Sequence, residues 1–479
     1  MKRLGDIIVD LKQNGVYGNK DIQVRGISYD SRDVQSDYLL CCIKGLKRNG
    51  HHYVEDAYRR GARSFIVERP IEKKEDTAVV KVPDTREALA LVSRRFYDDP
   101  SKKLKIVGIT GTDGKTTTSW LVRNIIRKTK QKVGLIGSVG YYIGNRRIEG
   151  ERTTPESSDI FSMLKEMSKR GIKYGVMEVT SHGIALKRTF GINYRVAVFT
   201  NISRDHLDFH KSSDNYISTK VHFFDNLNKD AISVINVDDS VGAQIAHRVR
   251  GRVITYGLKK VCDVSAYYRF NGCKGTLLNI VYRGRDFVTY FPFPGLYNVY
   301  NALASFSAGV ALNFTPQLIC SALKKRFLIP GRFEIIQTEP FTVVVDYAHT
   351  PDALRAVLTA ARELAEGRVI SVFGCGGERD KGKRPIMGSV ASELSDIVVV
   401  TSDNPRGEQP ELIIERIKNG IKYQNYKVIP DRREAIRFAI SEAKPKDFVV
   451  VAGRGAEKYQ IVGKEKIPLD DREVILDLL

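Results

Sequence analysis

The stretch LKIVGITGTDGKTTTSW, from Leu104 to Trp120, decides the fold of this chain, because an apolar strand there runs into a glycine-rich loop and then a helix. Such glycines let backbone N–H groups approach phosphate oxygens, and the positive end of the helix dipole points at the same place. In a loop of this kind Lys115 brings a positive charge to the terminal phosphates, and the Thr116 hydroxyl is a ligand of Mg²⁺. The stretch therefore predicts an ATP site in an α/β domain.

The spacing of this loop differs from the common phosphate-loop motif. Counting back from Lys115, that motif has its first glycine at position 109, where this chain has isoleucine, and the glycines are Gly108, Gly111 and Gly114 instead. A strand, a turn and a helix with three glycines can also be purely structural. The GKTTT ending favours the phosphate site over that alternative.

Apolar strands alternate with helical segments along most of the chain. The predicted strands are 105–109, 132–136, 174–179, 196–201 and 231–236, then 342–346, 369–373, 397–401 and 448–452. This alternation predicts parallel βαβ units and doubly wound sheets. Polar clusters follow several of these strands at their C-terminal ends, where ligands bind in open α/β sheets.

The length of 479 residues predicts about three domains at roughly 150 residues each. The N-terminal pattern is mixed, with helical periodicity at 5–12 and 54–60 and strand-like runs at 22–28, 38–43 and 64–67. A polar stretch at 98–103 predicts a linker, and FLIPGR at 327–332 predicts a hinge. We therefore expect three α/β domains: a mixed N-terminal domain (1–99), a doubly wound P-loop ATPase domain (100–328) and a Rossmann-like C-terminal domain (329–479).

The charge of the chain is unusual, with 77 Lys and Arg against 56 Asp and Glu and a net charge of +21. Nucleic acid, anionic small substrates and a solvated surface without a specific partner are all compatible with it. The basic residues are spread along the chain, and aromatic residues are not interleaved with them in any one stretch. Nucleic-acid binding is therefore not expected.

Location and redox state follow from the same bulk features. No apolar run approaches the ~20 residues of a membrane span, and Asp6 and Asp10 stand where a signal peptide needs an apolar centre. The six cysteines include no CxxC pair, so neither a zinc site nor a disulfide framework is indicated. Cys262 and Cys273 can meet in a hairpin, but free thiols are expected. We expect a cytoplasmic protein without membrane insertion.

Four further residues come under consideration for chemistry. Glu178 ends an apolar strand in VMEVTSHG, where either a hard cation beside ATP or a nearby arginine would balance its charge. His206 follows the next strand, and His210 stands four residues on without the glutamate of an HExxH motif, so His210 is expected to be capped or on the surface. Lys220 lies among aromatic residues in SDNYISTKVHFFD, which predicts a partly buried lysine with a readily shifted pKa.

The run VVVTSDNPRGE, from Val398 to Glu408, ends a buried strand in an acid, an amide, a proline and an arginine. A turn accounts for Asn404 and Pro405. It does not account for Asp403 and Arg406, which therefore point to a ligand.

Nine motifs occur in order along the chain: GITGTDGKTTT, EVTSHG, FTNISRDHLDFH, YNVYNALAS, PGRFE, DYAHTPDAL, FGCGGERDKGKRPIMG, TSDNPRGE and GRGAEKYQ. Together they resemble the Mur ligases over nearly the whole length, and specifically the members that add the third residue of the peptidoglycan stem peptide. The resemblance implies one domain for the UDP-linked substrate, one for ATP and one for the amino acid.

In that family the free carboxylate of UDP-N-acetylmuramoyl-L-alanyl-D-glutamate attacks the γ-phosphate of ATP, and the amine of the incoming amino acid attacks the acyl phosphate. The resemblance implies that Lys115 and Thr116 hold the phosphates and one Mg²⁺, and that Glu178 and His206 are ligands of a second. Lys220 matches the lysine that becomes carbamylated. The other implied ATP contacts are Gly111, Thr112, Gly114, Thr117, Asn298, Asn301, Arg332 and Asp346.

For the UDP-linked substrate, the resemblance implies Ser31, Thr153, Thr154, Thr180 and Arg188. For the amino acid it implies Arg379, Asp403, Asn404, Pro405, Arg406, Gly453 and Glu457. Arg406 would bind the distal carboxylate of meso-diaminopimelate through two parallel hydrogen bonds, and Glu457 would pair with its ammonium group. Diaminopimelate is therefore expected as the amino acid in preference to L-lysine. The alternative is that Arg406 has a purely structural role, in which it caps a helix or pairs with Glu408.

Three other functions remain as alternatives. The first is the same ligase with L-lysine as the amino acid that it adds. Folylpolyglutamate synthases share the ATPase core and the reaction type but lack the DSR-type uridine domain and the DNPR stretch. A nucleic-acid-dependent P-loop ATPase is favoured only by the charge and the phosphate loop. A monomer is expected.

Overall fold

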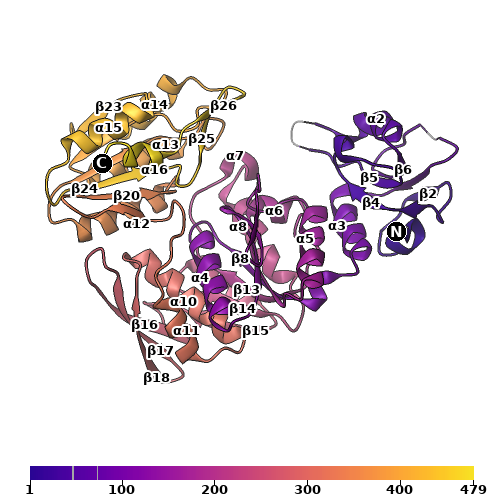
Figure 1. Cartoon of the computed structure of the whole chain (residues 1–479), viewed down its shortest axis with the longest axis horizontal. Helices are drawn as coiled ribbons and strands as arrows, with labels where there is room; N and C mark the ends of the chain where they lie inside the picture. Colours follow the sequence, from indigo (N-terminus) through magenta and orange to yellow (C-terminus); the bar gives the residue numbers. More distant parts are fainter. Residues whose placement is uncertain (46–47, 73) are drawn as a thin grey trace. The chain divides into compact units, whose positions relative to one another are not determined.

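The computed structural model (Figure 1) describes residues 1–45, 48–72 and 74–479, which form two compact units. The first unit contains residues 1–109, 130–197 and 226–231, and the second contains 110–129, 198–225 and 232–479. In the described part of the chain, no helix is both long and apolar enough to cross a membrane.

The first unit begins with a five-stranded sheet in the order β2-β7-β6-β5-β4, in which only β2 is antiparallel to its neighbour. Neighbouring residues of β5 point to opposite faces, so Leu39 packs towards α1 and α3 and Leu40 towards α2. The elements are β1 (Lys2–Arg3), α1 (Leu4–Ile7), β2 (Gly15–Tyr17), β3 (Gln23–Val24), β4 (Gly26–Ser28), β5 (Tyr38–Cys41), α2 (Val54–Arg59), β6 (Ala62–Val67), β7 (Ala78–Lys81) and α3 (Thr85–Phe96).

A second sheet of the first unit has the strand order β11-β10-β9-β12-β8. β9, β12 and β8 are parallel, and β10 and β11 extend them as an antiparallel hairpin. Helix α5 packs beside α3 (Figure 1). The elements are β8 (Lys105–Thr110), β9 (Val133–Gly137), β10 (Gly140–Ile143), β11 (Arg146–Ile148), α5 (Ser157–Lys169), β12 (Tyr174–Glu178) and α6 (Ser181–Ala185), and β13 (Tyr194–Phe199) leads into the second unit.

In the second unit, the phosphate-loop helix α4 packs against the almost entirely buried helix α10. Parallel strands β14, β15 and β16 continue into an antiparallel β16-β17-β18 meander. The elements are α4 (Lys115–Lys128), α7 (Leu207–His210), α8 (Ser213–Asp225), β14 (Ile232–Asn236), α9 (Ser240–Arg248), β15 (Arg252–Tyr256), β16 (Val264–Phe270), β17 (Thr276–Tyr282), β18 (Arg285–Phe291), α10 (Leu296–Ala311) and α11 (Pro316–Leu323).

The C-terminal part of the second unit is a doubly wound sheet in the order β19-β20-β24-β21-β22-β23. Val344 and Val450 pack against α12, α13 and α14 on one face, whereas Val343 and Val451 pack against α15 and α16 on the other. The elements are β19 (Glu334–Gln337), β20 (Thr342–Asp346), α12 (Pro351–Leu364), β21 (Val369–Phe373), α13 (Lys383–Leu394), β22 (Ile397–Val400), α14 (Pro410–Lys418), β23 (Tyr426–Val428), α15 (Arg432–Glu442), β24 (Phe448–Ala452), β25 (Tyr459–Val462), β26 (Glu465–Pro468) and α16 (Asp471–Leu476).

The nine predicted α/β strands are confirmed, each within two residues at either end. The helix predicted over 5–12 is wrong beyond Ile7, because the carbonyl of Ile8 accepts from Leu11 N and from the Gln13 side chain and does not continue the helical ladder. The run 22–28 is two short strands, and the linker 98–103 contains a 3₁₀ turn with Pro100 buried. The β16–β18 meander was not predicted. All six cysteines are free thiols.

Candidate active site

The phosphate loop joins β8 to α4 and takes the conformation that its glycines allow. Gly111 and Gly114 have φ values of 146° and 82°, which favour glycine. A Cβ at Gly111 would overlap the Thr200 hydroxyl, and one at Gly114 would overlap the Asn301 amide oxygen. Lys115 folds back over the loop, with Nζ 3.0 Å from the Gly111 carbonyl and 2.6 Å from that of Thr112.

Arg332 reaches this loop from a position 216 residues later, and its Nη2 donates to Thr116 Oγ1 over 3.0 Å. Its guanidinium also lies 4.4 Å from the ring of Tyr347. Asp346 ends β20 nearby, with its carboxylate accepting from the backbone N–H groups of Phe333 and Ala348 over 2.6 and 2.8 Å. Burial raises the pKa of Asp346, and the charge of Arg332 opposes that rise. The predicted residues Thr116, Arg332 and Asp346 are thus brought together.

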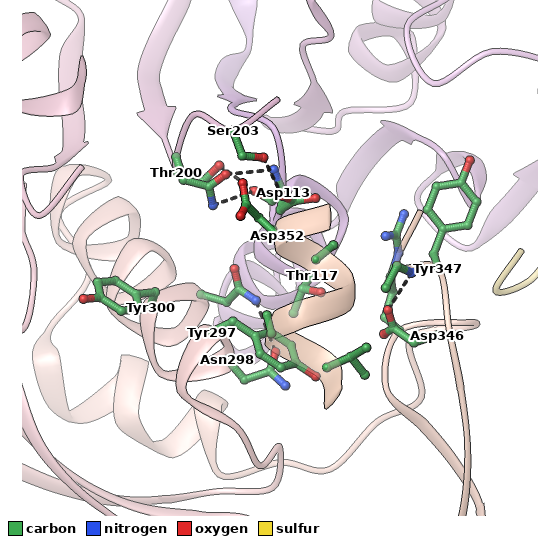
Figure 2. A pocket seen from close by; sticks show the side chains of 18 of the residues that line it. Asp113, Thr117, Thr200, Ser203, Tyr297, Asn298, Tyr300, Asp346, Tyr347 and Asp352 are labelled. Atoms are coloured by element: carbon green, nitrogen blue, oxygen red, sulfur yellow. Dashed lines mark hydrogen bonds between the residues drawn. The ribbon is translucent and has the colours of Figure 1, made fainter. Parts of the chain in front are cut away.

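A pocket of about 310 Å³ lies beside the loop and is lined from both parts of the second unit (Figure 2). The polar groups of the loop form one wall, and Tyr297, Tyr300 and Asn298 of α10 form another. Asn298 and Asn301 are buried, and Asn301 Nδ2 donates to Asn298 Oδ1 over 3.1 Å. Thr117 also lines the pocket. Its size and its mixed polar and aromatic walls suit a purine nucleotide.

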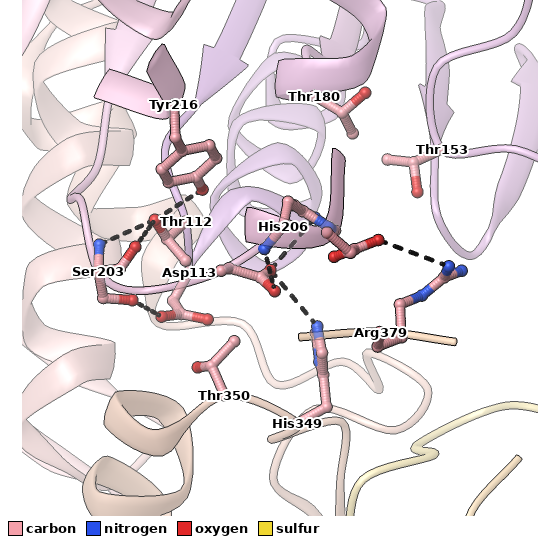
Figure 3. A network of polar contacts seen from close by, with 12 residues as sticks. Thr112, Asp113, Thr153, Thr180, Ser203, His206, Tyr216, His349, Thr350 and Arg379 are labelled. Carbon is pink, nitrogen blue, oxygen red and sulfur yellow. Dashed lines mark hydrogen bonds and ion pairs between the residues drawn. The ribbon is translucent and has the colours of Figure 1, made fainter. Parts of the chain in front are cut away.

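A polar network surrounds the phosphate loop (Figure 3). The buried Asp205 carboxylate lies 3.2 Å from His206 Nε2 and 3.8 Å from His349 Nε2. Although burial raises the pKa of Asp205, hydrogen bonding to His349 and the charge of His206 lower it well below its usual value. Thr112 Oγ1 lies 2.9 Å from the hydroxyl of Tyr216, on α8. His206 is therefore held by a carboxylate next to the loop.

Lys220 is fully buried on α8, with Nζ donating to the Gly111 carbonyl over 2.7 Å. The sequence predicted only partial burial. The Tyr216 ring lies 4.9 Å from the same Nζ. Burial, and after it the charge of Lys115, lower the pKa of Lys220 well below the usual lysine value. A larger fraction of this amine is therefore neutral and able to react.

The surface position expected for His210 is wrong, because its side chain is buried. Its ring packs between the rings of Phe209 and Tyr216, with centroid separations of 4.8 and 5.3 Å. The apolar contacts of this short helix outweigh the polarity that suggested exposure.

In the first unit, Glu178 lies at the end of β12 and is 1% exposed. Its carboxylate accepts from Ser138 N over 2.9 Å and from Ser138 Oγ over 3.0 Å. A side chain at Gly137 would overlap this carboxylate, so the glycine permits the approach. Thr153 Oγ1 lies 3.0 Å from the same serine hydroxyl. An oxygen donor of this kind suits a hard cation.

The threonines predicted for the UDP-linked substrate are joined to one another. Thr154 Oγ1 donates to the Glu178 carbonyl over 2.8 Å and accepts from Thr180 N over 3.1 Å. Arg188 Nη1 donates to the Thr154 carbonyl over 3.1 Å. Ser31 is buried at the start of a 3₁₀ turn (Ser31–Asp33), and no contact recorded among the described residues joins it to this group.

The sequence missed Glu156 at the edge of this group. Its buried carboxylate is surrounded by the guanidiniums of Arg86, Arg152 and Arg188 at 3.2, 2.9 and 3.0 Å. Three cations and one anion leave an excess positive charge, which suits an anionic substrate. Glu156 and Arg86 are 70 residues apart, so no local motif indicates the pair.

The DNPR turn follows β22 and presents Arg406 with φ 52°. Arg406 Nη1 donates to the carbonyls of Gly377 and Asn404 over 2.8 and 3.3 Å. Among the described residues Arg406 has no ion pair with a carboxylate, and Glu408 instead binds Arg384 at 2.9 Å. The alternative in which Arg406 meets Glu408 is therefore wrong. Burial, and after it the charge of Arg379, lower the pKa of Arg406.

Acidic groups lie on the other side of this turn. Asn404 Nδ2 donates to Glu457 Oε2 over 2.8 Å, and the Asp403 carboxylate is so close to Gly453 that a Cβ there would meet it at 2.8 Å. Burial, and after it the charge of Asp403, raise the pKa of Glu457. Pro405 packs against the Gly377 backbone. The loops after β21, β22 and β24 therefore bring together two cations, Arg379 and Arg406, and two acids, Asp403 and Glu457. Such a set suits a ligand that carries both positive and negative charges.

Arg379 lies in the loop before α13 (Figure 3), and its Nη1 contacts Asp208 Oδ2 at 4.0 Å. Arg204, near His206, binds Asp380 with an Nε to Oδ2 distance of 2.8 Å. These two ion pairs join the segment around His206 to the loop that contains Arg379 and Asp380. The sequence analysis did not predict three residues of this network: Asp113, Asp205 and His349. Of these, His349 lies in the motif DYAHTPDAL, which could have indicated it.

Family models match three successive parts of the chain: Mur ligase family, catalytic domain over residues 23–97; Mur ligase middle domain over 109–309; and Mur ligase, glutamate ligase domain over 331–455. The chain belongs to the Mur ligase family, with its three domains.

Individual relatives narrow the comparison. A Clostridium botulinum protein named UDP-N-acetylmuramoyl-L-alanyl-D-glutamate–2,6-diaminopimelate ligase is 43% identical over 99% of this chain and 98% of its own length. A solved structure of a ligase of that name has a TM-score of 0.70 and 30% identity, covering 100% of this chain and 98% of its own. The Thermotoga maritima MurF ligase in complex with ADP has a TM-score of 0.68 at 20% identity, covering 96% of this chain and 98% of its own, and shares the fold.

Proposed function

We propose that this chain adds meso-diaminopimelate to UDP-N-acetylmuramoyl-L-alanyl-D-glutamate with ATP, by way of an acyl phosphate. It is an ATP-dependent acid–amino-acid ligase of peptidoglycan synthesis, and relatives that it matches over 98% of their lengths are named as diaminopimelate ligases. The observation that carries the proposal is the convergence of Lys115, Thr116 and Arg332 on one loop beside a nucleotide-sized pocket. A phosphoryl transfer needs positive charge at that place.

The roles of the ATP-site residues follow from their chemistry. Lys115 and Arg332 neutralise the charge that develops on the transferring phosphoryl group. Asn298 and Asn301 hold the base side of the nucleotide, supported by Gly111, Thr112, Gly114, Thr117 and Asp346 around the phosphates. Phosphoryl transfer to the glutamate carboxylate gives an acyl phosphate and ADP. Attack by the amine of the amino acid then forms the amide and releases phosphate.

Mg²⁺ is proposed as the metal. Two ions are proposed, one with the Thr116 hydroxyl as a ligand and a second with Glu178 and His206, and the hydroxyl and the buried carboxylate are oxygen donors that suit a hard cation. When bound, the metal supplies charge neutralisation to the phosphates. Asp205 holds the His206 ring from the side at 3.2 Å and so limits its orientations.

Carbamylation of Lys220 is also proposed. A neutral lysine amine adds to carbon dioxide and loses a proton, which turns the side chain into an anion with two oxygens. The support is the full burial of Lys220 and its lowered pKa, caused by burial and the Lys115 charge. A carboxylated side chain there would help to orient the metal.

For the UDP-linked substrate we propose Ser31, Thr153, Thr154, Thr180 and Arg188. For diaminopimelate we propose Arg379 and Arg406 as the partners of the distal carboxylate, and Glu457, assisted by Asp403, Asn404, Pro405 and Gly453, as the partner of the ammonium group. L-Lysine lacks the distal carboxylate and would leave Arg406 desolvated and unpaired, at a cost of roughly 2–5 kcal/mol. This difference favours diaminopimelate.

The proposed domain limits are 1–99 for the UDP-linked substrate, 100–328 for ATP and 329–479 for the amino acid. A cytoplasmic monomer is proposed, because ATP and UDP-linked precursors are cytoplasmic metabolites. The folylpolyglutamate synthase and nucleic-acid-dependent ATPase alternatives do not account for the DNPR turn and its acidic partners.

The decisive experiment incubates the protein with ATP, Mg²⁺ and the UDP-linked dipeptide, and offers diaminopimelate or L-lysine in separate reactions. Mass spectrometry of the products is expected to find the diaminopimelate tripeptide. Equal use of the two amino acids would contradict the amino-acid choice. ATP hydrolysis stimulated by nucleic acid, without product formation, would contradict the ligase itself.

A further inference from the structure

Arg454, in the loop after β24, is a buried arginine that the proposed reaction leaves without a role. Its side chain is fully buried, and Nη2 donates to the Leu469 carbonyl over 2.9 Å. Nε and Nη1 have no hydrogen-bond partner within the described residues. Buried N–H groups of a guanidinium are nearly always satisfied, so this arrangement requires an explanation.

A second buried arginine nearby shows what a purely structural role looks like. Arg432 binds Asp471 through Nε and Nη2 at 2.9 and 2.7 Å, and both side chains are fully buried. Its Nη2 also donates to the Ala452 carbonyl over 2.9 Å. Because both oxygens of the Asp471 carboxylate accept from Arg432, Arg454 has no hydrogen-bonded carboxylate among the described residues.

The acid that Arg454 faces is Glu457, whose Oε2 lies 3.9 Å from Arg454 Nε. The same oxygen accepts from Asn404 Nδ2 of the DNPR turn over 2.8 Å. The Glu457 carboxylate therefore lies between a buried cation and the residues proposed to bind the amino acid.

We propose that Arg454 is a positioning residue of the amino-acid site, which orients the Glu457 carboxylate and supplies the positive charge that keeps it ionised for the substrate ammonium group. The inference rests on the proposed function and adds a residue that touches no substrate. Arg454 is suited to this role because a guanidinium stays charged where a lysine would lose its proton.

The electrostatics of Glu457 show why such a cation is needed. Burial and the nearby Asp403 raise the pKa of Glu457, whereas the hydrogen bond from Asn404 and the charges of Arg454 and His349 lower it. A protonated Glu457 is neutral and loses its attraction for an ammonium group. The other charged or titratable groups that feel Glu457 are Arg406, Arg432 and Tyr347.

The test measures the KM for diaminopimelate against pH in the full-length enzyme. The KM of the wild type is expected to rise as the pH falls through the pKa of Glu457. In Arg454→Met the rise is expected to begin at higher pH, and at pH values below the pKa of Glu457 in both proteins the KM is expected to be about tenfold above wild type, the factor that one pKa unit represents. The kcat and the KM for ATP are expected to stay unchanged. His349 is present in both proteins, so the difference between the two profiles reports Arg454.

Two further variants complete the test. Arg454→Lys is expected to restore the wild-type profile only in small part, because an amine buried at this place loses its proton more readily than a guanidinium does. Arg368→Gln is the matched control, because it removes an ion pair of the same sheet (to Asp447 at 2.7 Å) from the start of β21, and it is expected to leave the profile unchanged.

A wild-type profile in folded Arg454→Met, or an equal shift in Arg368→Gln, would overturn the proposal. If Arg454→Met does not fold, Glu457→Gln takes its place: its KM is expected to be high and to lose the pH dependence, and a retained dependence would overturn the proposal. If the wild type incorporates a different amino acid, the proposed substrate is wrong, and the same profiles measured with the accepted amino acid still decide the role of Arg454.

Discussion

Replacing Arg406 with alanine is expected to raise the KM for meso-diaminopimelate by about two orders of magnitude. In the structure Arg406 uses only Nη1 for the Gly377 and Asn404 carbonyls, which leaves Nε and Nη2 for a carboxylate. Two charge-assisted hydrogen bonds at the lower end of their range, about 1.5 kcal/mol each, sum to about 3 kcal/mol. That energy corresponds to a factor of about 150 in KM. The lower end of the energy range is used because, in the Arg406→Ala variant, Arg379 remains to attract the same carboxylate.

The assay follows phosphate release at saturating ATP and UDP-linked dipeptide while the amino acid is varied. With L-lysine, which has no distal carboxylate, Arg406→Ala is expected to leave the KM unchanged or to lower it. Arg368→Ala, which loses an ion pair at the opposite end of the C-terminal strands, is the control for general destabilisation. A folded Arg406→Ala enzyme with an unchanged KM for diaminopimelate, or with an equal rise in the KM for ATP, would refute the reasoning.

Three other predictions address the remaining parts of the molecule. Lys115→Ala is expected to reduce kcat on the order of 10²-fold or more, because it removes a preorganised charge at the transferring phosphoryl group, and near-normal turnover with a native unfolding curve would contradict this. Lys220→Ala is expected to be nearly inactive and partly rescued by formate, whereas an unmodified lysine in a fully active enzyme, detected by mass spectrometry without acidification, would exclude carbamylation. Arg384 lowers the pKa of Glu408 to about 2, so the stabilisation is present above the usual glutamate pKa and is lost as the pH falls towards 2. Glu408→Gln is therefore expected to lower the free energy of unfolding at pH 7 by about 2–3 kcal/mol and to flatten its acid dependence, and a variant as stable as wild type in urea would disprove the pairing.

Local pattern was sufficient for the α/β strands and for the residues that follow them. Buried strands such as Thr342–Asp346 and Phe448–Ala452 are continuous apolar runs, and the polar residues after them break the pattern abruptly. Local sequence pattern failed where contacts between side chains decided where a helix ends or whether a residue is buried. Helix α1 ends early because the Gln13 side chain competes for the Ile8 carbonyl, and His210 is buried by aromatic neighbours from α7 and α8.

The sequence by itself determined the buried strands of the α/β sheets, the phosphate loop and the family, because periodicity and motif spacing are properties of neighbouring residues. Only the tertiary structure decided which of the distant groups meet. Arg332 reaches Thr116 across 216 residues, and Asn404 reaches Glu457 across 53. These meetings depend on strand order, since β24 enters the sheet between β20 and β21 and brings the Gly453–Glu457 loop beside the DNPR turn. Strand order is set by the packing of whole faces, Val343 against one layer of helices and Val344 against the other, and no short stretch of sequence encodes it.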